Sequence, residues 1–387
     1  MTILFWISAC LVVYTYLGYP LLLWVFARLR PRDVRKRKIH PSVSIIIAAR
    51  NEADKIRNKI DNTLTLNYPP SLIEVIVASD ASDDGTDEIV RSYAPKGVQL
   101  VRAPQRKGKE YVQGLAVAAS KGEILVFTDA ATMLEPDAIG PLVENFGDLS
   151  VGAVSTEDLL VDAGGVPTGE GLYVRYEMCV RRLESRFHSL VGLSGSCFAI
   201  RRELCAHWSP TLASDFIGAL NAARSGYRSV ADPSARGRVP GIISARLEFP
   251  RKVRTFLRGI TVLMANLDLL NPFRYGRFAF QLASHKLLRL LAPFLLLSIL
   301  GTTGVLMREQ PFPLIFWTQI GFYALGVTGG LVTALQRNAI VRVVYYFTMV
   351  QWAMLVAWVK YARGHQQIAW EPSKRPGIVA PDHGSTH

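Results

Sequence analysis

The sequence predicts an α/β domain flanked by transmembrane helices, on three observations. Patterns typical of strands and helices alternate from Val43 to Ser155, as in folds built from βαβ units. Half of the 387 residues are hydrophobic, and they concentrate towards both ends of the chain, as expected of membrane segments around a globular domain. The length leaves room for about two or three domains.

The net charge and the cysteines narrow the possible function classes. The formal charge is +13, but much of it lies beside the apolar segments, where basic residues face anionic lipid and fix orientation. The sequence has no zinc-finger spacing, RNA-binding aromatic signature or basic helix repeat, so we do not expect a nucleic acid partner. The four cysteines form no CxxC pair, which argues against a disulfide framework or a zinc site and fits a reducing compartment.

The first apolar segment, from Ile3 to Phe26, carries no charge and is long enough to cross a bilayer. A secretory signal peptide has a basic start and a shorter apolar core, whereas here the basic residues follow the segment. They are Arg28, Arg30, Arg32, Arg35, Lys36, Arg37 and Lys38, opposed only by Asp33. Because Lys and Arg favour the cytoplasmic side, we predict an uncleaved anchor that places the following domain in the cytosol.

Strands and helices then alternate along the chain. A β-branched run from Val43 to Ala48 predicts the first strand, and Asn51 opens a helix with Ile56, Ile60 and Leu64 on one face. The elements predicted next are a strand at 74–78, a helix after 83–86, a strand at 98–101, an Ala-rich helix to 120, a strand from 124 that stops at 129, a helix at 136–146 and a strand at 151–155.

Three of these strands end in polar or acidic residues. The first is followed by Arg50-Asn51-Glu52, the second by Asp80, and the apolar run from Ile124 to Phe127 stops at Asp129. A single Asp after a strand is often only a turn residue, but packing does not explain three such clusters. Ligands of open α/β sheets bind outside the carboxyl ends of the strands. We therefore predict a nucleotide site at this edge, where Asp129 can hold a hard cation that binds phosphate.

The regular alternation ends after Asp162-Ala-Gly-Gly165. A long charged helix is predicted from Leu172 to Leu190, followed by a Gly/Ser turn from Gly192 that enters a strand. A further helix begins near Ser214, with this serine as the predicted N-cap. Tyr227 to Ala231 is the last short strand predicted.

From Arg254 onward, apolar residues recur with four-three spacing between Phe256 and Leu270. This spacing predicts a helix that leads to Pro272. The helix either lies in the membrane interface or is an ordinary core helix, and periodicity does not distinguish the two. Three apolar segments that we predict to be transmembrane follow, at Leu287–Met307, Pro313–Leu335 and Val341–Val359.

The end of the chain raises a topological question. Three crossings that start in the cytosol would place Lys360 and Arg363 outside, against the positive-inside bias. Either one segment does not fully span or the bias is overridden; both alternatives stay open. Trp370 is expected to anchor the tail at the interface. The predicted organisation is an anchor at 1–27, a basic linker at 28–41, the α/β domain at 42–250, an interfacial helix region at 251–285, transmembrane helices at 286–360 and a polar tail at 361–387.

Eight short motifs occur in one order and spacing, and each would be weak alone. They are Ala49–Glu52, Ser79–Thr86, Gly108-Lys109, Phe127–Ala130, Gly195–Arg202, Ser214–Arg228, Glu248–Arg254 and Ser284–Lys286. In these motifs, from Val43 to Arg289, the chain resembles membrane-embedded family 2 glycosyltransferases. This group contains cellulose, hyaluronan and poly-N-acetylglucosamine synthases. The resemblance implies a GT-A fold, a Rossmann-like mixed sheet, for the cytosolic domain.

The resemblance also implies a reaction and the residues that carry it. The expected reaction moves a sugar from a nucleotide-diphosphate sugar, expected to be a UDP-sugar, with inversion at the anomeric carbon. Asp129 would bind Mg²⁺ or Mn²⁺, a Lewis acid for the leaving diphosphate. Asp215 would be the general base, and Arg254 with Arg251 would suit the diphosphate. The donor-binding residues implied by the resemblance are Arg50, Glu52, Asp80, Lys109 and Asp129.

The resemblance further implies partners and a location. The acceptor would be a growing polysaccharide or a polyprenyl-linked molecule, and membrane lipids and other polysaccharide-assembly proteins would be partners. The location expected of the group is the bacterial inner membrane, in a multi-pass arrangement with the catalytic domain cytosolic.

Four positions depart from the family pattern: Ala131, Ser214, Thr255 and Gly114. Ala131 removes an oxygen ligand, so the metal would be held mainly by Asp129, the diphosphate and water. Thr255 replaces a Trp of the acceptor channel, which weakens any prediction of processive synthesis. These departures keep open an alternative function, a non-catalytic scaffold subunit of a polysaccharide-export complex.

Thr156-Glu157-Asp158 repeats the family's Thr-Glu-Asp motif literally. It follows Asp129 by fewer than thirty residues and precedes the Gly/Ser segment. The order of the family motifs therefore favours Asp215 over Asp158 as the base.

Overall fold

The computed structural model describes residues 1–161, 172–240 and 245–365, and the chain divides into two compact units. The helical unit comprises Met1–Trp24, Ser244–Leu270 and Phe280–Gln367. The α/β unit comprises Val25–Ile243, Asn271–Ala279 and Ile368–His387. The predicted loop at 162–165 and the predicted anchor Trp370 lie outside the described residues.

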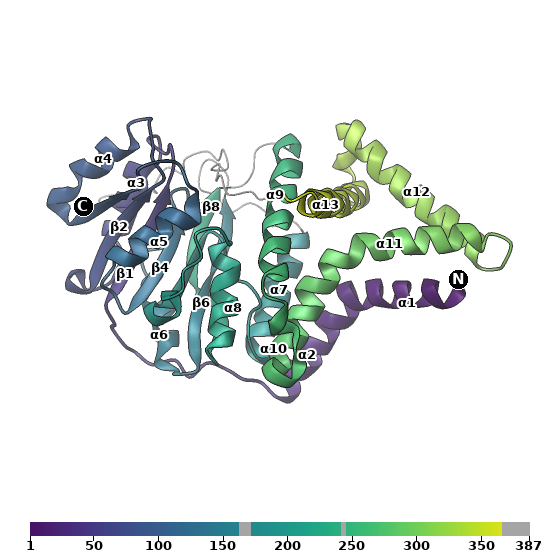
Figure 1. The fold of residues 1–387 in the computed structure, drawn as a ribbon, viewed down its shortest axis with the longest axis horizontal. Coiled ribbons are helices and arrows are strands. Elements are labelled where there is room, and N and C mark those ends of the chain that lie inside the picture. The colour runs from purple at the N-terminus through teal and green to yellow at the C-terminus, as the bar shows by residue number, and fades with distance from the viewer. Residues whose placement is uncertain (162–171, 241–244, 366–387) are drawn as a thin grey trace, which may run out of the picture. The chain divides into compact units, whose positions relative to one another are not determined.

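The α/β unit is built on one mixed sheet, with eight strands in the described part of the chain (Figure 1). The order across the sheet is β3-β2-β1-β4-β7-β6-β8-β5. Strands β1 to β4 are parallel, β7 is antiparallel to both β4 and β6, and β8 is parallel to β6. The carboxyl ends of β1, β2, β4, β6 and β8 therefore meet at one edge of the sheet. The strands are β1 (Val43–Ala49), β2 (Ile73–Ser79), β3 (Val98–Arg102), β4 (Ile124–Asp129), β5 (Met133–Leu134), β6 (Val151–Val161), β7 (Cys197–Arg201) and β8 (Arg228–Pro240).

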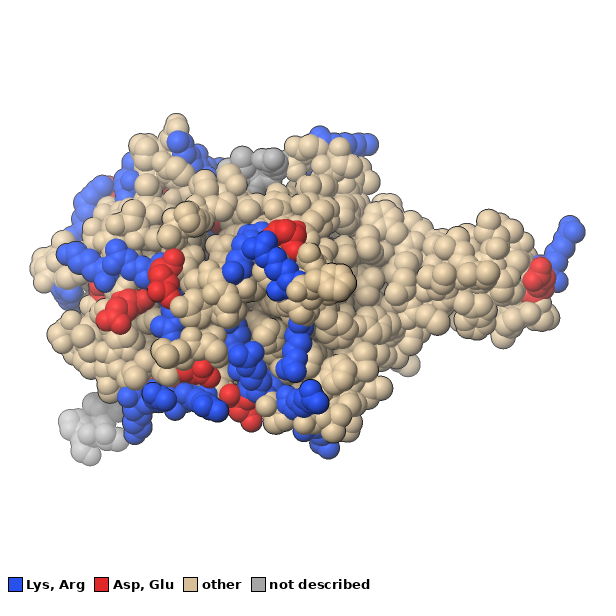
Figure 2. All heavy atoms as spheres, turned by 60° about the horizontal axis from the view of Figure 1, so that its bottom comes forward, with Lys and Arg blue, Asp and Glu red and all other residues tan. Residues whose placement is uncertain are grey.

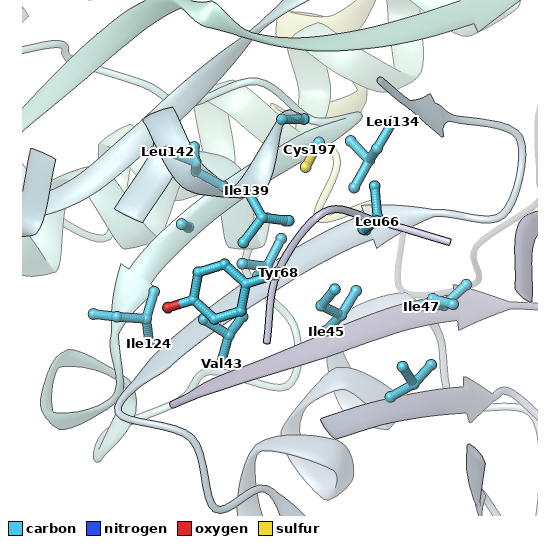
Figure 3. Close-up of a cluster of buried hydrophobic side chains, with 14 of the residues drawn as sticks. Val43, Ile45, Ile47, Leu66, Tyr68, Ile124, Leu134, Ile139, Leu142 and Cys197 are labelled. Atoms are coloured by element: carbon cyan, nitrogen blue, oxygen red, sulfur yellow. The ribbon is translucent and has the colours of Figure 1, made fainter. Parts of the chain in front are cut away.

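Helices cover both faces of this sheet. Successive side chains of a strand point to opposite faces, and every residue of β1 is buried. On one face Ile45 packs in a cluster with Ile139, and Figure 3 shows this apolar layer. On the other face Ile46 packs with Val112. Burial on both faces explains why these strands are uninterrupted apolar runs. The helices of this unit are α3 (Ile56–Leu64), α4 (Thr86–Ser92), α5 (Lys109–Ala119), α6 (Ile139–Glu144), α7 (Leu172–Phe187), α8 (Ser214–Arg224) and most of α10 (Pro272–Leu282).

Two of the predicted helix starts are wrong because of the local backbone conformation. The helix expected to open at Asn51 begins at Ile56, because Asn51 has a φ of +52° and the chain makes a turn first. The second error concerns the N-cap of α8, which is the extended residue Ala213. Ser214 is already helical and buried, so its hydroxyl does not cap this helix.

The second half of the sheet is longer than predicted. The sequence predicts strands that end near Ser155 and Ala231, whereas β6 and β8 pair with each other up to Val161 and Pro240. β5 is absent from the prediction and pairs with β8. The extensions of β6 and β8 contain charged or turn-forming residues, such as Asp158 and Pro233, that give no strand signal of their own. The ladder between the two extensions supplies partners for their backbone groups.

Four helices within the described residues are long and apolar enough to cross a membrane, by length and composition. They are Thr2–Leu29, Pro272–Val305, Phe312–Leu331 and Ala339–Ala362. They correspond to the predicted anchor and to the three predicted C-terminal segments. Their components are α1 (Thr2–Val13), α2 (Tyr19–Leu29), α10, α11 (Leu288–Val305), α12 (Phe312–Leu331) and α13 (Ala339–Ala362), with π-helical turns at Tyr14–Gly18 and Ala283–Leu287.

The helix predicted from Arg254 is α9, and it begins earlier, at Ala245, and ends at Met264. Within the helical unit α9 packs against α13. Ile260 and Leu263, two members of the predicted apolar row, are buried. The row therefore faces protein over this part of the helix.

We predict that Phe127→Ala destabilises the α/β unit by about 3–5 kcal/mol, the usual loss when a buried Phe becomes Ala. Phe127 is buried and stacks on Phe198 and Trp208, with ring centroids 5.0 and 4.8 Å away. Thermal unfolding of the purified chain in detergent measures the effect. Phe273→Ala is the matched control, because that side chain is exposed. A loss no larger than the control's would mean that the stack does not stabilise the core.

Candidate functional site

The register of three parallel strands brings the predicted donor residues to one edge. Ala48 of β1 pairs with Asp129 of β4, and Ala49 pairs with Ser79 of β2. The residues that follow β1 and β2 therefore lie next to the end of β4. This confirms the prediction that the polar residues at the ends of β1, β2 and β4 meet at one edge of the sheet.

Asp80 is fully buried, and its carboxylate holds the loop that precedes α5. One carboxylate oxygen accepts a hydrogen bond from the Lys107 backbone N–H at 2.8 Å, and the other accepts from Gly108 N–H at 3.0 Å. Gly108 has a φ of +99°, which an L side chain rarely adopts. Asp80 thereby fixes where α5 begins, and with it the position of Lys109.

Arg50 ties the loop after β1 to the loop after β2. Its guanidinium donates to the backbone oxygens of Asp80 and Ala81 and, at 3.1 Å, to the Asp83 carboxylate. Asn51 donates to the other oxygen of Asp83 at 2.7 Å. These hydrogen bonds join the two loops, so they form one continuous surface at this part of the sheet edge; we call this surface the Arg50 wall.

Glu52 is buried, and Lys55 donates to its carboxylate at 2.9 Å. Burial raises the pKa of the Glu52 carboxyl, and the Lys55 ammonium opposes that rise. Lys55 was not among the predicted site residues, although its spacing of three from Glu52 suits a salt bridge across one turn. The Glu52 N–H donates to Thr86 Oγ1 at 2.9 Å, which joins this turn to the start of α4.

Lys109 and Asp129 meet in a salt bridge. Lys109 is the first residue of α5, and its ammonium donates to the Asp129 carboxylate and, at 3.3 Å, to the Gly195 carbonyl. The Asp129 N–H donates to the Ser196 carbonyl at 3.0 Å. The Gly/Ser segment before β7 therefore lies directly against the end of β4.

Asp215 reaches the same segment from the other side. It is the second residue of α8, and its carbonyl accepts a hydrogen bond from Leu193 N–H at 3.0 Å. A β-carbon added to Gly195 would lie only 3.2 Å from Asp215 Oδ2. Gly195 thus separates the Lys109–Asp129 pair from the Asp215 carboxylate by one residue without a side chain. The predicted donor residues and the predicted base come together in one site.

Asp158, set aside in the sequence analysis, lies in this site as well. Ser194 donates to one of its carboxylate oxygens at 2.7 Å, and Ser196 donates to the other. Asp158 therefore positions the loop around Gly195. Its neighbour Glu157 forms a salt bridge with Arg182.

Lys59 is a buried cation that the sequence analysis did not detect. Its side chain is fully buried in α3 and donates to the Thr132 carbonyl at 2.6 Å. Thr132 N–H donates to the Asp129 carbonyl, so Lys59 supports the turn that carries Asp129. Burial lowers the pKa of the Lys59 ammonium to about 8. A Lys on a helix face with buried neighbours has no distinctive sequence signal.

The described residues contain no group of three or more His, Cys, Asp or Glu side chains that could hold a metal ion. Asp129 offers one half-buried carboxylate at the strand end, and Ala131 offers no oxygen. A hard cation prefers oxygen ligands in larger number. The residues present therefore fit a cation that shares Asp129 with oxygens of a bound diphosphate, rather than a preformed metal site.

Arg251 and Arg254 lie on α9 in the helical unit. Arg251 forms a salt bridge with Glu248 at 3.4 Å. Their predicted contact with the diphosphate stays a prediction.

Comparison with known proteins identifies the α/β unit. Residues 44–208 match the model of glycosyl transferase family 2. The chain carries a family 2 glycosyltransferase domain. Its fold is similar to the solved structure of the mannosyltransferase PcManGT from Pyrobaculum calidifontis in complex with GDP-Man and Mn²⁺, with a TM-score of 0.71 and 23% identity over 94% of this chain and 100% of that one. The predicted GT-A fold is confirmed.

Two curated relatives of the glycosyltransferase domain illustrate the range of the family. A beta-monoglucosyldiacylglycerol synthase of Trichormus variabilis is 31% identical over 38% of this chain and 33% of its own length. A poly-beta-1,6-N-acetyl-D-glucosamine synthase of Staphylococcus epidermidis is 23% identical over 40% of this chain and 38% of its own. The chain spans less than half the length of these curated relatives.

We predict that Ala81→Gly raises the stability of the domain by about 0.5–1 kcal/mol. Ala81 has a φ of +55°, where a β-carbon costs about 1–2 kcal/mol. Glycine removes this cost, but its greater freedom in the unfolded chain lowers the stability by about 0.4–1 kcal/mol. Thermal unfolding measures the change. Ala118→Gly, at an exposed position of α5, is the matched control and should lose about 0.5–1 kcal/mol. Destabilisation by Ala81→Gly would show that the left-handed backbone is not strained.

Proposed function

We propose that the protein transfers a sugar from a nucleotide-diphosphate sugar to a growing polysaccharide or a lipid-linked acceptor, with inversion at the anomeric carbon. The observation that carries the proposal is the meeting of Lys109, Asp129 and Asp215 around Gly195 at the carboxyl edge of the sheet. A cation, a carboxylate that can share a metal with a diphosphate, and a second carboxylate on the acceptor side are the groups that such a transfer needs.

On the donor side, each residue has one task in the proposal. Glu52 and the Arg50 wall would bind the uridine part of a UDP-sugar, while Asp80 keeps the loop before α5 in place. Lys109 would switch from Asp129 to a donor phosphate oxygen, because an ammonium readily exchanges one oxyanion for another. Arg251 and Arg254 of α9 would add charge-assisted hydrogen bonds to the diphosphate.

A divalent cation, Mg²⁺ or Mn²⁺, would be held by Asp129 together with the diphosphate and would supply Lewis-acid stabilisation of the leaving group. Mn²⁺ in the similar mannosyltransferase structure supports this choice. Lys59 stays below the Asp129 turn and keeps that carboxylate in place.

On the acceptor side, Asp215 would take the proton of the attacking hydroxyl. In a single displacement the hydroxyl oxygen forms a bond to the anomeric carbon as the bond to the diphosphate breaks, and the proton passes to the carboxylate. Gly195 has no β-carbon that would crowd Asp215 Oδ2. Asp158 keeps that segment in position through Ser194 and Ser196.

The proposed location is the inner membrane of a bacterium, with the catalytic domain on the cytosolic side. Four candidate spans and the basic run from Arg28 to Lys38 support a multi-pass membrane protein with this orientation. A lipid-linked or membrane-associated acceptor suits this location, and other polysaccharide-assembly proteins are proposed partners.

We predict that Asp215→Asn lowers turnover by about 10²–10⁴-fold, the usual contribution of a positioned general base. The measurement is release of nucleoside diphosphate from a panel of nucleotide sugars with Mg²⁺ or Mn²⁺ and native membrane lipid. Asp137→Asn, at an exposed position before α6, is the matched control and should leave turnover unchanged. If no donor gives turnover above that of Asp215→Asn, the protein is not an enzyme and the scaffold function is favoured.

We also predict that metal binding depends on the donor. Because Asp129 is the one protein carboxylate proposed for the metal, Mn²⁺ should bind weakly alone and about 5- to 150-fold more tightly with UDP present, the usual range of coupling between two sites. Calorimetry measures both affinities, and Asp129→Asn should remove the coupling while Asp137→Asn keeps it. A tight site in the protein without UDP would mean that the ligands have been assigned wrongly.

A further inference from the structure

The α/β unit has a cavity that the proposed reaction does not use. Its volume is about 180 Å³, room for roughly six water molecules at about 30 Å³ each, which admits a phosphate group with part of its ester. The cavity is lined by Arg32, His188, Ala223, Gly226, Tyr227, Arg228, Arg274, Tyr275 and Phe278.

This cavity lies at the opposite edge of the sheet from Asp129. Arg228 is the first residue of β8, and its N–H donates to the Ser150 carbonyl just before β6. Asp129 is the last residue of β4. Since β4, β6 and β8 run in the same direction, Arg228 is at the amino-terminal edge. A ligand in this cavity is therefore not the sugar donor.

Arg228 builds the floor of the cavity and brings a buried charge to it. Its side chain is among the largest that are fully buried, with 2% of the residue exposed. The guanidinium donates to the carbonyls of Arg32 and Ser185, both at 2.6 Å, and to the carbonyl of His188 at 2.9 Å. These three partners are neutral. They fix the position of the guanidinium at the cavity, and its charge also interacts with the carboxylates of Asp148 and Asp33.

Arg32 and His188 form the next wall. The Arg32 guanidinium lies 3.0 Å from His188 Nδ1. Because a guanidinium can only donate, Nδ1 accepts, and the imidazole is neutral with its proton on Nε2. The pKa of His188 is lowered to about 4 by burial and by the charges of Arg32, Arg228 and Arg277. At neutral pH the charge in this wall therefore comes from arginine alone.

The residues that line the cavity include three arginines and no carboxylate. The nearby Asp33 is engaged by Arg186 at 3.3 Å, and Asp148 accepts hydrogen bonds from Ser150 and from Arg35 N–H. Arginine presents a planar fork of donors that matches the oxygens of phosphate. The chemistry of this cavity is that of a site for a phosphate ester anion.

The sequence neighbours of the cavity indicate where that phosphate comes from. Arg32 follows the candidate span Thr2–Leu29 by three residues, and Arg274 is the third residue of the candidate span Pro272–Val305. Phe273 and Leu29, at the same two span ends, are 99% and 73% exposed. The face turned to the viewer in Figure 2 is rich in Lys and Arg. Two spans end at the cavity wall, where lipid headgroups would lie.

We propose that this cavity binds the phosphate of an anionic phospholipid, with Arg32, Arg228 and Arg274 facing the phosphate oxygens. Tyr227, Tyr275 and Phe278 form an apolar side of the cavity for the ester part of the headgroup. The proposal rests on the proposed membrane location and not on the proposed sugar transfer. The bound lipid would hold the start of α10 and the linker after α2 at the membrane surface.

The test compares two double variants of the full chain in detergent micelles. Arg32→Gln/Arg274→Gln removes two exposed charges from the cavity, and Arg30→Gln/Arg35→Gln removes two exposed charges that do not line it. Binding of short-chain phosphatidylglycerol, phosphatidylcholine and inorganic phosphate is measured by calorimetry. We expect wild type to prefer phosphatidylglycerol over both other probes. The cavity variant should lose about tenfold or more of that affinity, and the control variant less than about twofold.

Equal losses in the two double variants would overturn the proposal, because the basic face would then act without a site. Equal binding of inorganic phosphate would indicate a site for a soluble anion instead, and equal binding of phosphatidylcholine would exclude recognition of charge. Unfolding without lipid checks that each variant folds; if the cavity variant does not, Arg274→Gln alone serves in its place. Sugar-nucleotide turnover of wild type in phosphatidylcholine reports on the proposed function separately.

Discussion

The central strands of the α/β unit are buried on both faces, and the rest of the structure follows from this constraint. Each residue of β1 must be small or apolar along its length, because helices cover both faces of the sheet. Charged groups therefore gather where these strands end. The parallel register then brings the ends of β1, β2 and β4 side by side. One packing rule thus produces both the core and the concentration of Arg50, Asp80 and Asp129 at one edge.

Strand β7 completes this edge because it runs antiparallel to both of its neighbours, β4 and β6. β7 enters beside β4 in the opposite direction, so the residues before β7 arrive at the carboxyl end of β4. Gly195 lies in this segment, where Lys109 donates to its carbonyl and Asp215 lies beside the position that a β-carbon would take. A larger residue here would fill the gap between the Lys109–Asp129 pair and the Asp215 carboxylate. The Asp158 carboxylate, bonded to Ser194 and Ser196, keeps this short segment from moving.

In the described part of the α/β unit, two cationic side chains are fully buried. Lys59 and Arg228 are both withdrawn from water and bonded to backbone carbonyls. Burial of a charge without a counter-ion is costly, so each position needs a reason. Lys59 lies under the turn that carries Asp129, and Arg228 forms the floor of the cavity at the opposite edge. Each is therefore paired in space with a place where negative charge is present or expected.

The sequence by itself determined the class of fold, the apolar spans and the residues of the donor edge. Strands such as β1 and β4 have a continuous apolar pattern that local periodicity reveals, and Asp80, Lys109, Asp129 and Asp215 belong to short motifs in a fixed order. These features depend on near neighbours in the chain or on burial common to every strand. They are accessible without knowledge of distant contacts.

Only the tertiary structure decided the features that depend on partners far away in the chain. The extensions of β6 and β8 are strands because they pair with each other, whereas residues such as Asp158 and Pro233 do not predict a strand locally. Asp158 accepts hydrogen bonds from Ser194 and Ser196, which lie in the segment before β7. Lys59 donates to the carbonyl of a residue 73 positions later in the chain. The cavity at Arg228 joins four separate segments, each unremarkable by itself. The hydrogen-bonding groups of these segments find their partners far away in the chain, so no local sequence pattern predicts these features.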